Sequence, residues 1–273
     1  MVELAEVLAD LSEESTGLDN LVANLGDAQW RRETPAAGWT IRHQIAHLAW
    51  TDHVSVMAIA EPDAFVSHLG AALEEPGSFV DKGAEEFLDE PAALLARWRE
   101  GRAALAETLR SVPTGQKIPW YGTAMSATSM ATARIMETWA HGLDVAETLG
   151  VVRAPTARLR HIAHLGHRTL GNGFVMHGRP APTEPVALRL GAPDGSVWSF
   201  GPPEAADQIT GPALDFCLLV TQRRHRDDLA LVATGPVANE WLDVAQVFAG
   251  PPGSGRERSG ANAAAAGANG VAG

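Results

Sequence analysis

The chain has 273 residues, of which 45% are hydrophobic, and its formal net charge is −12. This length suits two domains or one large one, and the acidic balance argues against nucleic acid and anionic membranes as partners. A single cysteine, Cys217, excludes a disulfide within the chain. The N-terminus lacks the basic region and apolar block of a signal peptide, and no apolar run approaches membrane-spanning length, so we expect a cytoplasmic protein.

Apolar residues in the first part of the chain recur with the spacing of amphipathic helices. Thr40 is suited to cap a helix, and Pro91 to occupy the first turn of another. The periodicity predicts helices over about 2–25, 40–60, 62–74, 91–109, 126–150 and 155–174. Because such long helices alternate with loops, we predict an antiparallel four-helix bundle over residues 1–178.

The composition changes near Gly178, where a stretch rich in proline and glycine reads as a linker. Beyond it, alternating segments predict strands over 186–190, 197–200, 207–210 and 229–234, the first two forming a hairpin, with helices over 212–223 and 236–248. These elements predict a small α+β domain over residues 179–250, which makes the whole chain α+β. Residues 251–273 are poor in core-forming side chains, so we expect a disordered tail.

The predicted helix over 126–150 carries the pair of side chains with the clearest chemical potential. Glu137 and His141 are four residues apart and therefore leave the same helical face, among apolar neighbours. A carboxylate and an imidazole arranged in this way supply two ligands of a catalytic metal site. His47, in the predicted helix over 40–60, is the natural third ligand. The alternative is an ordinary surface pair of the kind that is common on helices.

Other histidines compete for this role. His43 lies one turn before His47 but near the start of its helix, so we interpret it as a supporting or surface group. Asp52 and His53 are weaker candidates further along the same helix. The third-residue repeat of histidines at 161, 164 and 167 rotates around its helix, and only His164 could face a bundle interior.

The segment Gly38-Trp-Thr-Ile-Arg-His-Gln-Ile-Ala-His47 resembles the N-terminal signature of the mycothiol-dependent maleylpyruvate isomerase group, within the DinB-like metal-binding bundles. Glu137-Thr-Trp-Ala-His141 is similar to the second element of that family. The segment from Gly211 to Arg224 is similar to its C-terminal element, which ends in basic residues. The resemblance covers roughly residues 1–250. It implies a DinB-like bundle in which His47, Glu137 and His141 bind a divalent metal, usually zinc, with mycothiol as the thiol partner.

We therefore expect a mycothiol-dependent transferase or isomerase that acts on a small electrophile. Arg223 and Arg224, in a basic cluster with His225 and Arg226, are the candidate catalytic residues, because arginine pairs bidentately with carboxylates. The cluster also suits a solvated helix end. A metal-dependent hydrolase or cyclase, or a metal-containing binding protein without turnover, are the alternatives. Neither the substrate nor the oligomeric state follows from the sequence.

Overall fold

The computed structural model describes residues 3–75, 77–253 and 255–259. The chain divides into two compact units, Met1–Ala154 and Pro155–Gly273, which we describe separately. This division lies earlier than the expected boundary at residue 178. The reason is that α8 (Leu159–Arg168) packs against α10 (Ala213–Val220), and α9 (Leu170–Met176) against α11 (Pro236–Val244).

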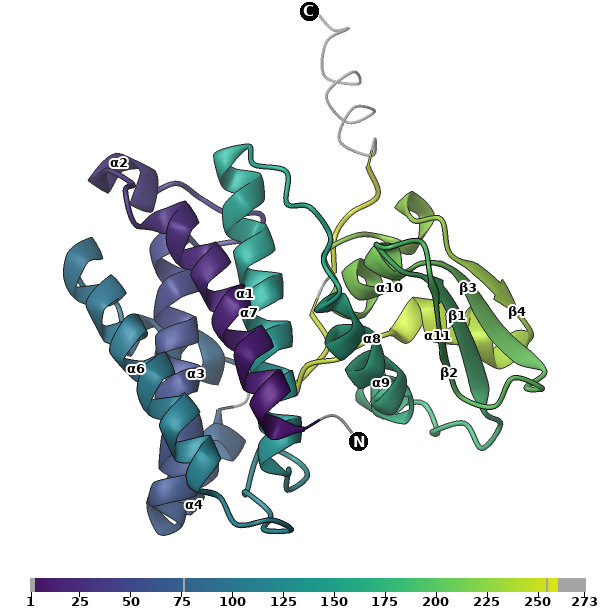
Figure 1. Ribbon diagram of the computed structural model, residues 1–273, viewed down its shortest axis with the longest axis horizontal. Helices are drawn as coiled ribbons and strands as arrows, with labels where there is room; N and C mark the ends of the chain where they lie inside the picture. Colours follow the sequence, from purple (N-terminus) through teal and green to yellow (C-terminus); the bar gives the residue numbers. More distant parts are fainter. Residues whose placement is uncertain (1–2, 76, 254, 260–273) are drawn as a thin grey trace, which may run out of the picture. The chain divides into compact units, whose positions relative to one another are not determined.

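Four long helices form the first unit, as the apolar periodicity predicts (Figure 1). They are α1 (Leu4–Val22), α3 (Ile41–Ala60), α6 (Pro91–Ser111) and α7 (Ala127–Leu149). Helix α3 packs against both α6 and α7, and α1 packs against α7. The bundle also carries three shorter helices: α2 (Asp27–Trp30), α4 (Pro62–Glu74) and α5 (Phe79–Glu86).

The two helices that matter most for the site begin at polar caps. At the start of α3, the backbone amide of Thr40 donates to Nδ1 of His43 at 3.2 Å, so a histidine takes the part that glutamate or glutamine plays in a capping box. At the start of α7, the Ser126 hydroxyl accepts from the amide of Ser129 at 3.1 Å. These caps fix where each helix begins.

Ion pairs between helices fix the register of the bundle. Arg134 on α7 donates from Nε to Asp52 on α3 at 2.9 Å, and both side chains are almost completely buried. Arg99 and Arg102 on α6 both bind Asp19 on α1, with N–O distances of 2.5 Å. A buried charge that loses its partner is costly, so the Arg134–Asp52 pair disfavours sliding of α3 along α7.

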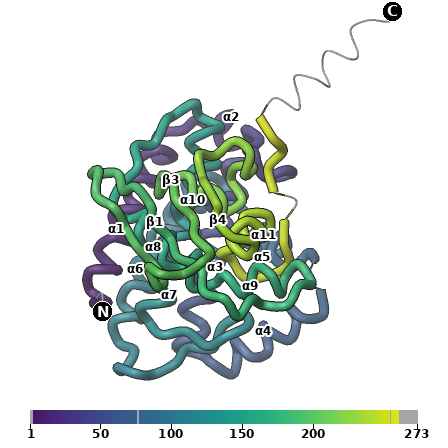
Figure 2. The backbone as a smooth tube through the Cα atoms, turned by 90° about the vertical axis from the view of Figure 1, so that its right-hand side faces the viewer, coloured from purple at the N-terminus to yellow at the C-terminus, as the bar shows by residue number. Residues whose placement is uncertain are grey.

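The second unit contains a four-stranded sheet in the order β2-β1-β3-β4, whose strands are drawn as arrows in Figure 1; β1, β3 and β4 are also labelled in Figure 2. The strands are β1 (Val186–Gly191), β2 (Val197–Phe200), β3 (Asp207–Pro212) and β4 (Val232–Thr234). The predicted hairpin of β1 and β2 is confirmed, β1 pairs with β3 in parallel, and β3 pairs with β4 antiparallel. The fold class is thus the predicted one: a helical bundle followed by a small α+β unit.

Three local predictions differ from the structure. The helix expected over 155–174 is divided into α8 and α9 at Thr169, whose hydroxyl donates to the carbonyl of Leu165 at 3.0 Å. Helix α2 lies in a stretch expected to be a loop. Helix α5 lies in another such stretch. Gly83 lets this helix approach Trp50 closely, because a Cβ there would lie 2.3 Å from the Trp50 ring.

The predicted tail falls largely outside the described residues, which end at Ser259. Within the described part of residues 251–259, the backbone forms neither helix nor strand, and the Ser259 amide donates to the Asp228 carboxylate at 2.7 Å. In the described part of the chain, every helix is too short or too polar to cross a lipid bilayer.

Candidate metal centre

His47, Glu137 and His141 meet on the facing sides of α3 and α7. Nε2 of His47 and Nε2 of His141 each lie 3.2 Å from the same Glu137 oxygen, Oε2. The three donor atoms all lie within 4.8 Å of one another. Two ligand atoms at tetrahedral positions about 2.0–2.1 Å from a zinc ion are about 3.3–3.4 Å apart. The spacing of the donor atoms therefore fits a single small cation between them.

The site is partly shielded from water, and this controls the charge of Glu137. The side chains of His47, His141 and Glu137 are 7%, 13% and 21% exposed. Burial by itself raises the pKa of Glu137, but hydrogen bonds from His141 and His47 hold that pKa well below its usual value. Glu137 is consequently ionised near neutral pH and contributes a negative charge to the centre.

Trp39 lies against the imidazoles of the centre. Its ring centroid is 5.9 Å from that of His141, nearly parallel at 22°, and 5.3 Å from that of His47. The indole Nε1 donates to Asp81 on α5 at 2.8 Å, which fixes the position of the ring. Trp39 therefore covers part of both histidines, a role that the sequence analysis did not assign to it.

Gln44 is a second residue that the sequence analysis missed. It lies on α3, one turn before His47, and is fully buried. Its Oε1 atom lies 2.5 Å from Nδ1 of His141, on the other side of the imidazole from Glu137. The sequence signal that could have found it is an amide side chain one helical turn before a predicted ligand. Imidazole ligands are commonly held through a hydrogen bond to their second nitrogen.

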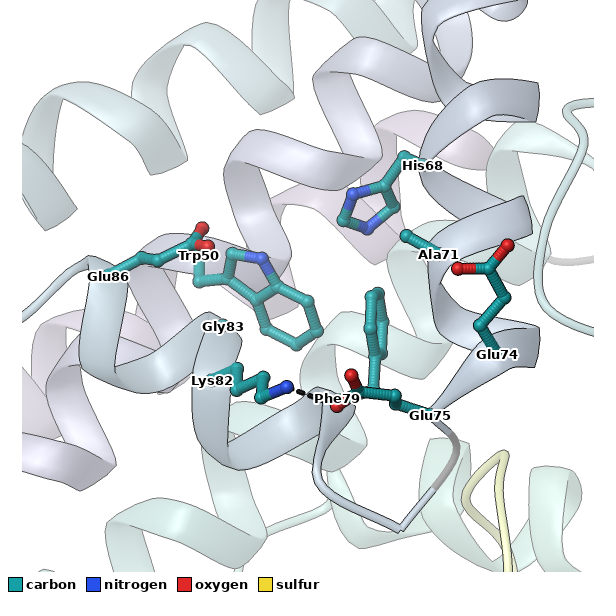
Figure 3. Close-up of a pocket in the computed structure, with 9 residues that line it drawn as sticks. All are labelled: Trp50, His68, Ala71, Glu74, Glu75, Phe79, Lys82, Gly83 and Glu86. Carbon is teal, nitrogen blue, oxygen red and sulfur yellow. Dashed lines mark hydrogen bonds and ion pairs between the residues drawn. The ribbon is translucent and has the colours of Figure 1, made fainter.

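An aromatic pocket, drawn in Figure 3, is lined in part by Trp50. The ring centroid of Trp50 is 5.8 Å from that of His47. This cavity of about 230 Å³ is lined by Trp50, His68, Ala71, Glu74, Glu75, Phe79, Lys82, Gly83 and Glu86. Lys82 is paired with Glu75, as the dashed line in Figure 3 marks. The polar part of the lining thus carries more negative than positive charge, which disfavours anions.

The loop that carries Trp120 and Tyr121 packs against residues that line this pocket. The Tyr121 hydroxyl lies 2.6 Å from Nε2 of His68, and its ring packs edge-on against Phe79. Trp120 stacks on Phe65 with the rings 8° from parallel. Tyr121 thus holds the lining residues His68 and Phe79 in place, and neither Tyr121 nor Trp120 belongs to the lining itself.

The competing residues have other contacts. His43 caps α3, as described above, and Asp52 is bound by Arg134. The His53 ring packs near Phe87, with centroids 5.5 Å apart. His164 belongs to the second unit, where its ring lies 6.2 Å from that of Phe200. Among the described residues, the grouping of His47, Glu137 and His141 is the one whose donor atoms converge closely enough to hold a metal.

The basic cluster follows α10 in the second unit. Arg223 donates to the Thr221 carbonyl and Arg224 to the Arg223 carbonyl, each at 2.7 Å. Arg226 forms an ion pair with Asp243 at 2.5 Å, so its guanidinium is engaged within the second unit. Gln222 lies just before the two arginines and has a φ of 57°. It follows α10 in the left-handed conformation that glycine most often adopts after the end of a helix. A contact of Arg223 or Arg224 with an anionic ligand stays a proposal.

Comparison with known proteins gives matches along most of the chain. The family model described as mycothiol maleylpyruvate isomerase N-terminal domain matches residues 11–146, which include all three residues of the centre. A second model, described as wyosine base formation, matches residues 191–234 of the second unit. Two Mycobacterium tuberculosis proteins, from strains CDC 1551 and H37Rv, are each 51% identical over 257 residues, or 94% of this chain and 100% of theirs. Both are described as uncharacterized.

Comparison with solved structures shows a shared fold. The crystal structure of the mycothiol-dependent maleylpyruvate isomerase matches with a TM-score of 0.55 at 17% identity, covering 92% of this chain and 97% of that one. A histidine-to-alanine mutant of that enzyme matches with a TM-score of 0.56 at 16% identity and the same coverage. At this identity the likeness concerns the fold. From the family match over the bundle and the shared fold, the chain belongs to the mycothiol-dependent maleylpyruvate isomerase-like family.

Proposed function

We propose that the protein is a metalloenzyme that binds one divalent cation, zinc by its donor set, through His47, Glu137 and His141. We further propose that it uses mycothiol as a cofactor or co-substrate in an isomerase or transferase reaction on a small electrophile. The observation that carries the proposal is the convergence of two Nε2 atoms on one carboxylate oxygen at 3.2 Å. Two imidazoles and one carboxylate are a common protein ligand set of catalytic zinc, which keeps a further position for an outside ligand.

A divalent cation held here would lower the pKa of a thiol or a water in that further position. The chain's own residues would fix the geometry: Glu137 supplies the negative charge, and the two imidazoles supply neutral donors. Trp39 covers the histidine rings and limits the approach of water from its side. Removing water strengthens the electrostatic interactions within such a site.

The thiol would have to come from outside the chain. Cys217 is the one cysteine, it is buried, and burial raises the pKa of its thiol. A thiol that stays protonated is a poor nucleophile. A small thiol is therefore the better candidate, and the isomerase with the same fold is described as mycothiol-dependent. A thiolate could add to an activated alkene, allow rotation and leave, or remain as a conjugate.

For an anionic substrate or thiol cofactor, we propose a contact with Arg223 or Arg224. The aromatic pocket is an unfavourable place for an anion, because Glu74, Glu75 and Glu86 line it and its one lysine is already paired. Arginine can bind a carboxylate through two parallel hydrogen bonds. The left-handed turn at Gln222 holds the two arginines directly after α10.

The test combines elemental analysis of the purified protein with titration of mycothiol by calorimetry, using metal-loaded and metal-stripped samples. We expect about one divalent cation per chain and mycothiol binding that depends on it. Stoichiometric metal without thiol affinity would favour a hydrolase, a cyclase or a binding protein in place of the thiol-dependent enzyme. Absence of metal from a protein supplied with zinc would contradict the proposed metal site, and with it the proposed function.

A further inference from the structure

A line of buried hydrogen bonds connects the centre to the loop before α3. Nδ1 of His141 lies 2.5 Å from Oε1 of Gln44, and Nε2 of Gln44 donates to the Thr34 hydroxyl at 2.8 Å. The Thr34 hydroxyl in turn donates to the Trp39 carbonyl at 2.7 Å. The line thus joins α7, α3 and the loop that carries Trp39.

The direction of each hydrogen bond in this line follows from its last member. The Trp39 carbonyl can only accept, so the single proton of the Thr34 hydroxyl points toward it. Thr34 must then accept from Gln44, which turns the amide NH2 group toward Thr34 and the amide oxygen toward His141. An amide oxygen cannot donate, and Nδ1 of His141 therefore carries a proton.

We infer that Gln44 is a positioning residue that keeps a proton on Nδ1 of His141, so that Nε2, on the Glu137 side of the ring, is the nitrogen left to bind the cation. The inference rests on the proposed metal site and names what prepares it. Gln44 acts on His141 selectively, because Nδ1 of His47 is buried and has no hydrogen-bond partner among the described residues. The second nitrogen of a ligand imidazole commonly sets its tautomer and orientation in this way, and loss of such a partner costs about 10–100-fold in metal affinity.

The same loop also positions the face of the His141 ring. The Trp39 carbonyl fixes the direction of the hydrogen bonds, while its indole lies nearly parallel to the imidazole at 5.9 Å. Thr34 binds that carbonyl twice, through its amide at 2.7 Å and its hydroxyl at 2.7 Å. The segment from Thr34 to Trp39 therefore sets both the orientation and the protonation site of a residue about one hundred positions later.

The test uses Gln44→Met, which keeps a similar side-chain volume but has no amide. Zinc affinity is measured by competition with a chromophoric chelator, and the His141 tautomer by nitrogen–proton NMR on the metal-free protein, assigned with His141→Ala. We expect about 10–100-fold weaker zinc binding and loss of the proton on Nδ1 of His141. Gln44→Glu, which retains an acceptor for Nδ1, should bind zinc more tightly than Gln44→Met.

Two further variants separate positioning from general damage to the helix. Thr34→Ser keeps the hydroxyl and should match the wild-type protein, whereas Thr34→Val should weaken zinc binding. Ser55→Ala removes another buried hydroxyl on α3, one that donates to the Thr51 carbonyl at 2.8 Å, and should leave zinc affinity unchanged.

Wild-type zinc affinity in Gln44→Met, or an Nδ1 of His141 that carries no proton in the wild-type protein, would overturn the inference. Failure of the proposed metal function is distinguishable, because the wild-type protein would then bind no zinc while the tautomer measurement on the metal-free protein still tests the role of Gln44.

Discussion

Nε2 of His47 lies 3.2 Å from Oε2 of Glu137, although ninety positions separate the two residues in the chain. The contact exists because α3 and α7 pack against each other with the register that the buried Arg134–Asp52 pair favours. His141 reaches the same oxygen from one turn further along α7. This junction of two helices is the basis of the first prediction.

His47→Ala and His141→Ala should each lose most of the bound zinc, because each removes one of only three protein ligands. Elemental analysis after dialysis against a weak chelator measures the loss, and circular dichroism checks that the helices remain. His53→Ala, an exposed change on the same helix, is the matched control and should retain the metal. Full metal content in both ligand variants would refute the assignment.

Arg223→Ala or Arg224→Ala should weaken the binding of mycothiol or of an anionic substrate and leave the metal content intact. Loss of a hydrogen bond to a charged group costs about 1.5–3 kcal/mol, which is about a tenfold or greater change in affinity. Calorimetric titration measures it. Arg179→Ala, which removes a surface pair with Glu240, serves as the control. Unchanged binding in the Arg223/Arg224 double variant would remove these residues from the site.

Gly83→Ala should destabilise the first unit, because the new Cβ would lie 2.3 Å from the Trp50 ring, beside the aromatic pocket. Overpacking of this kind costs about 1–3 kcal/mol, measured by denaturant unfolding. Gly70→Ala is the matched control on α4, where nothing lies within 4 Å of the added atom. There the change should be neutral or stabilising, because alanine is the better helix former. Equal effects at both positions would contradict the close packing of α5 on Trp50.

Tyr121 is the only tyrosine, so tyrosinate absorbance reports on it alone. Burial raises its pKa, and the folded protein should therefore keep the phenol protonated at pH values where a free tyrosine ionises, near about pH 10. The folded pKa of Tyr121 is the higher one. The contribution of Tyr121 to the free energy of unfolding is therefore fully present below the unfolded pKa, and it is lost as pH rises from the unfolded pKa toward the folded pKa. A native protein that titrates like the urea-unfolded protein would show that Tyr121 is not shielded.

Local pattern in the sequence is sufficient for most of the architecture. The long helices, the hairpin of β1 and β2 and the change to an α+β unit all follow from periodicity and turn residues, because these signals act over a few neighbouring positions. Glu137 and His141 could be paired for the same reason, since one turn of helix places them together. Their link to His47 depended on a recognised motif, because no local rule specifies which helices pack.

Packing between segments decided the rest. Gly83 weakens a helix in isolation, yet α5 forms there because only glycine lets the backbone approach Trp50. Gln44 looks like an ordinary polar residue of α3, and its role follows from Thr34 on one side and His141 on the other. The sequence by itself thus determined the elements and the ligand types. Only the tertiary structure decided the partners of each side chain, because hydrogen bonds between distant segments depend on how the helices pack.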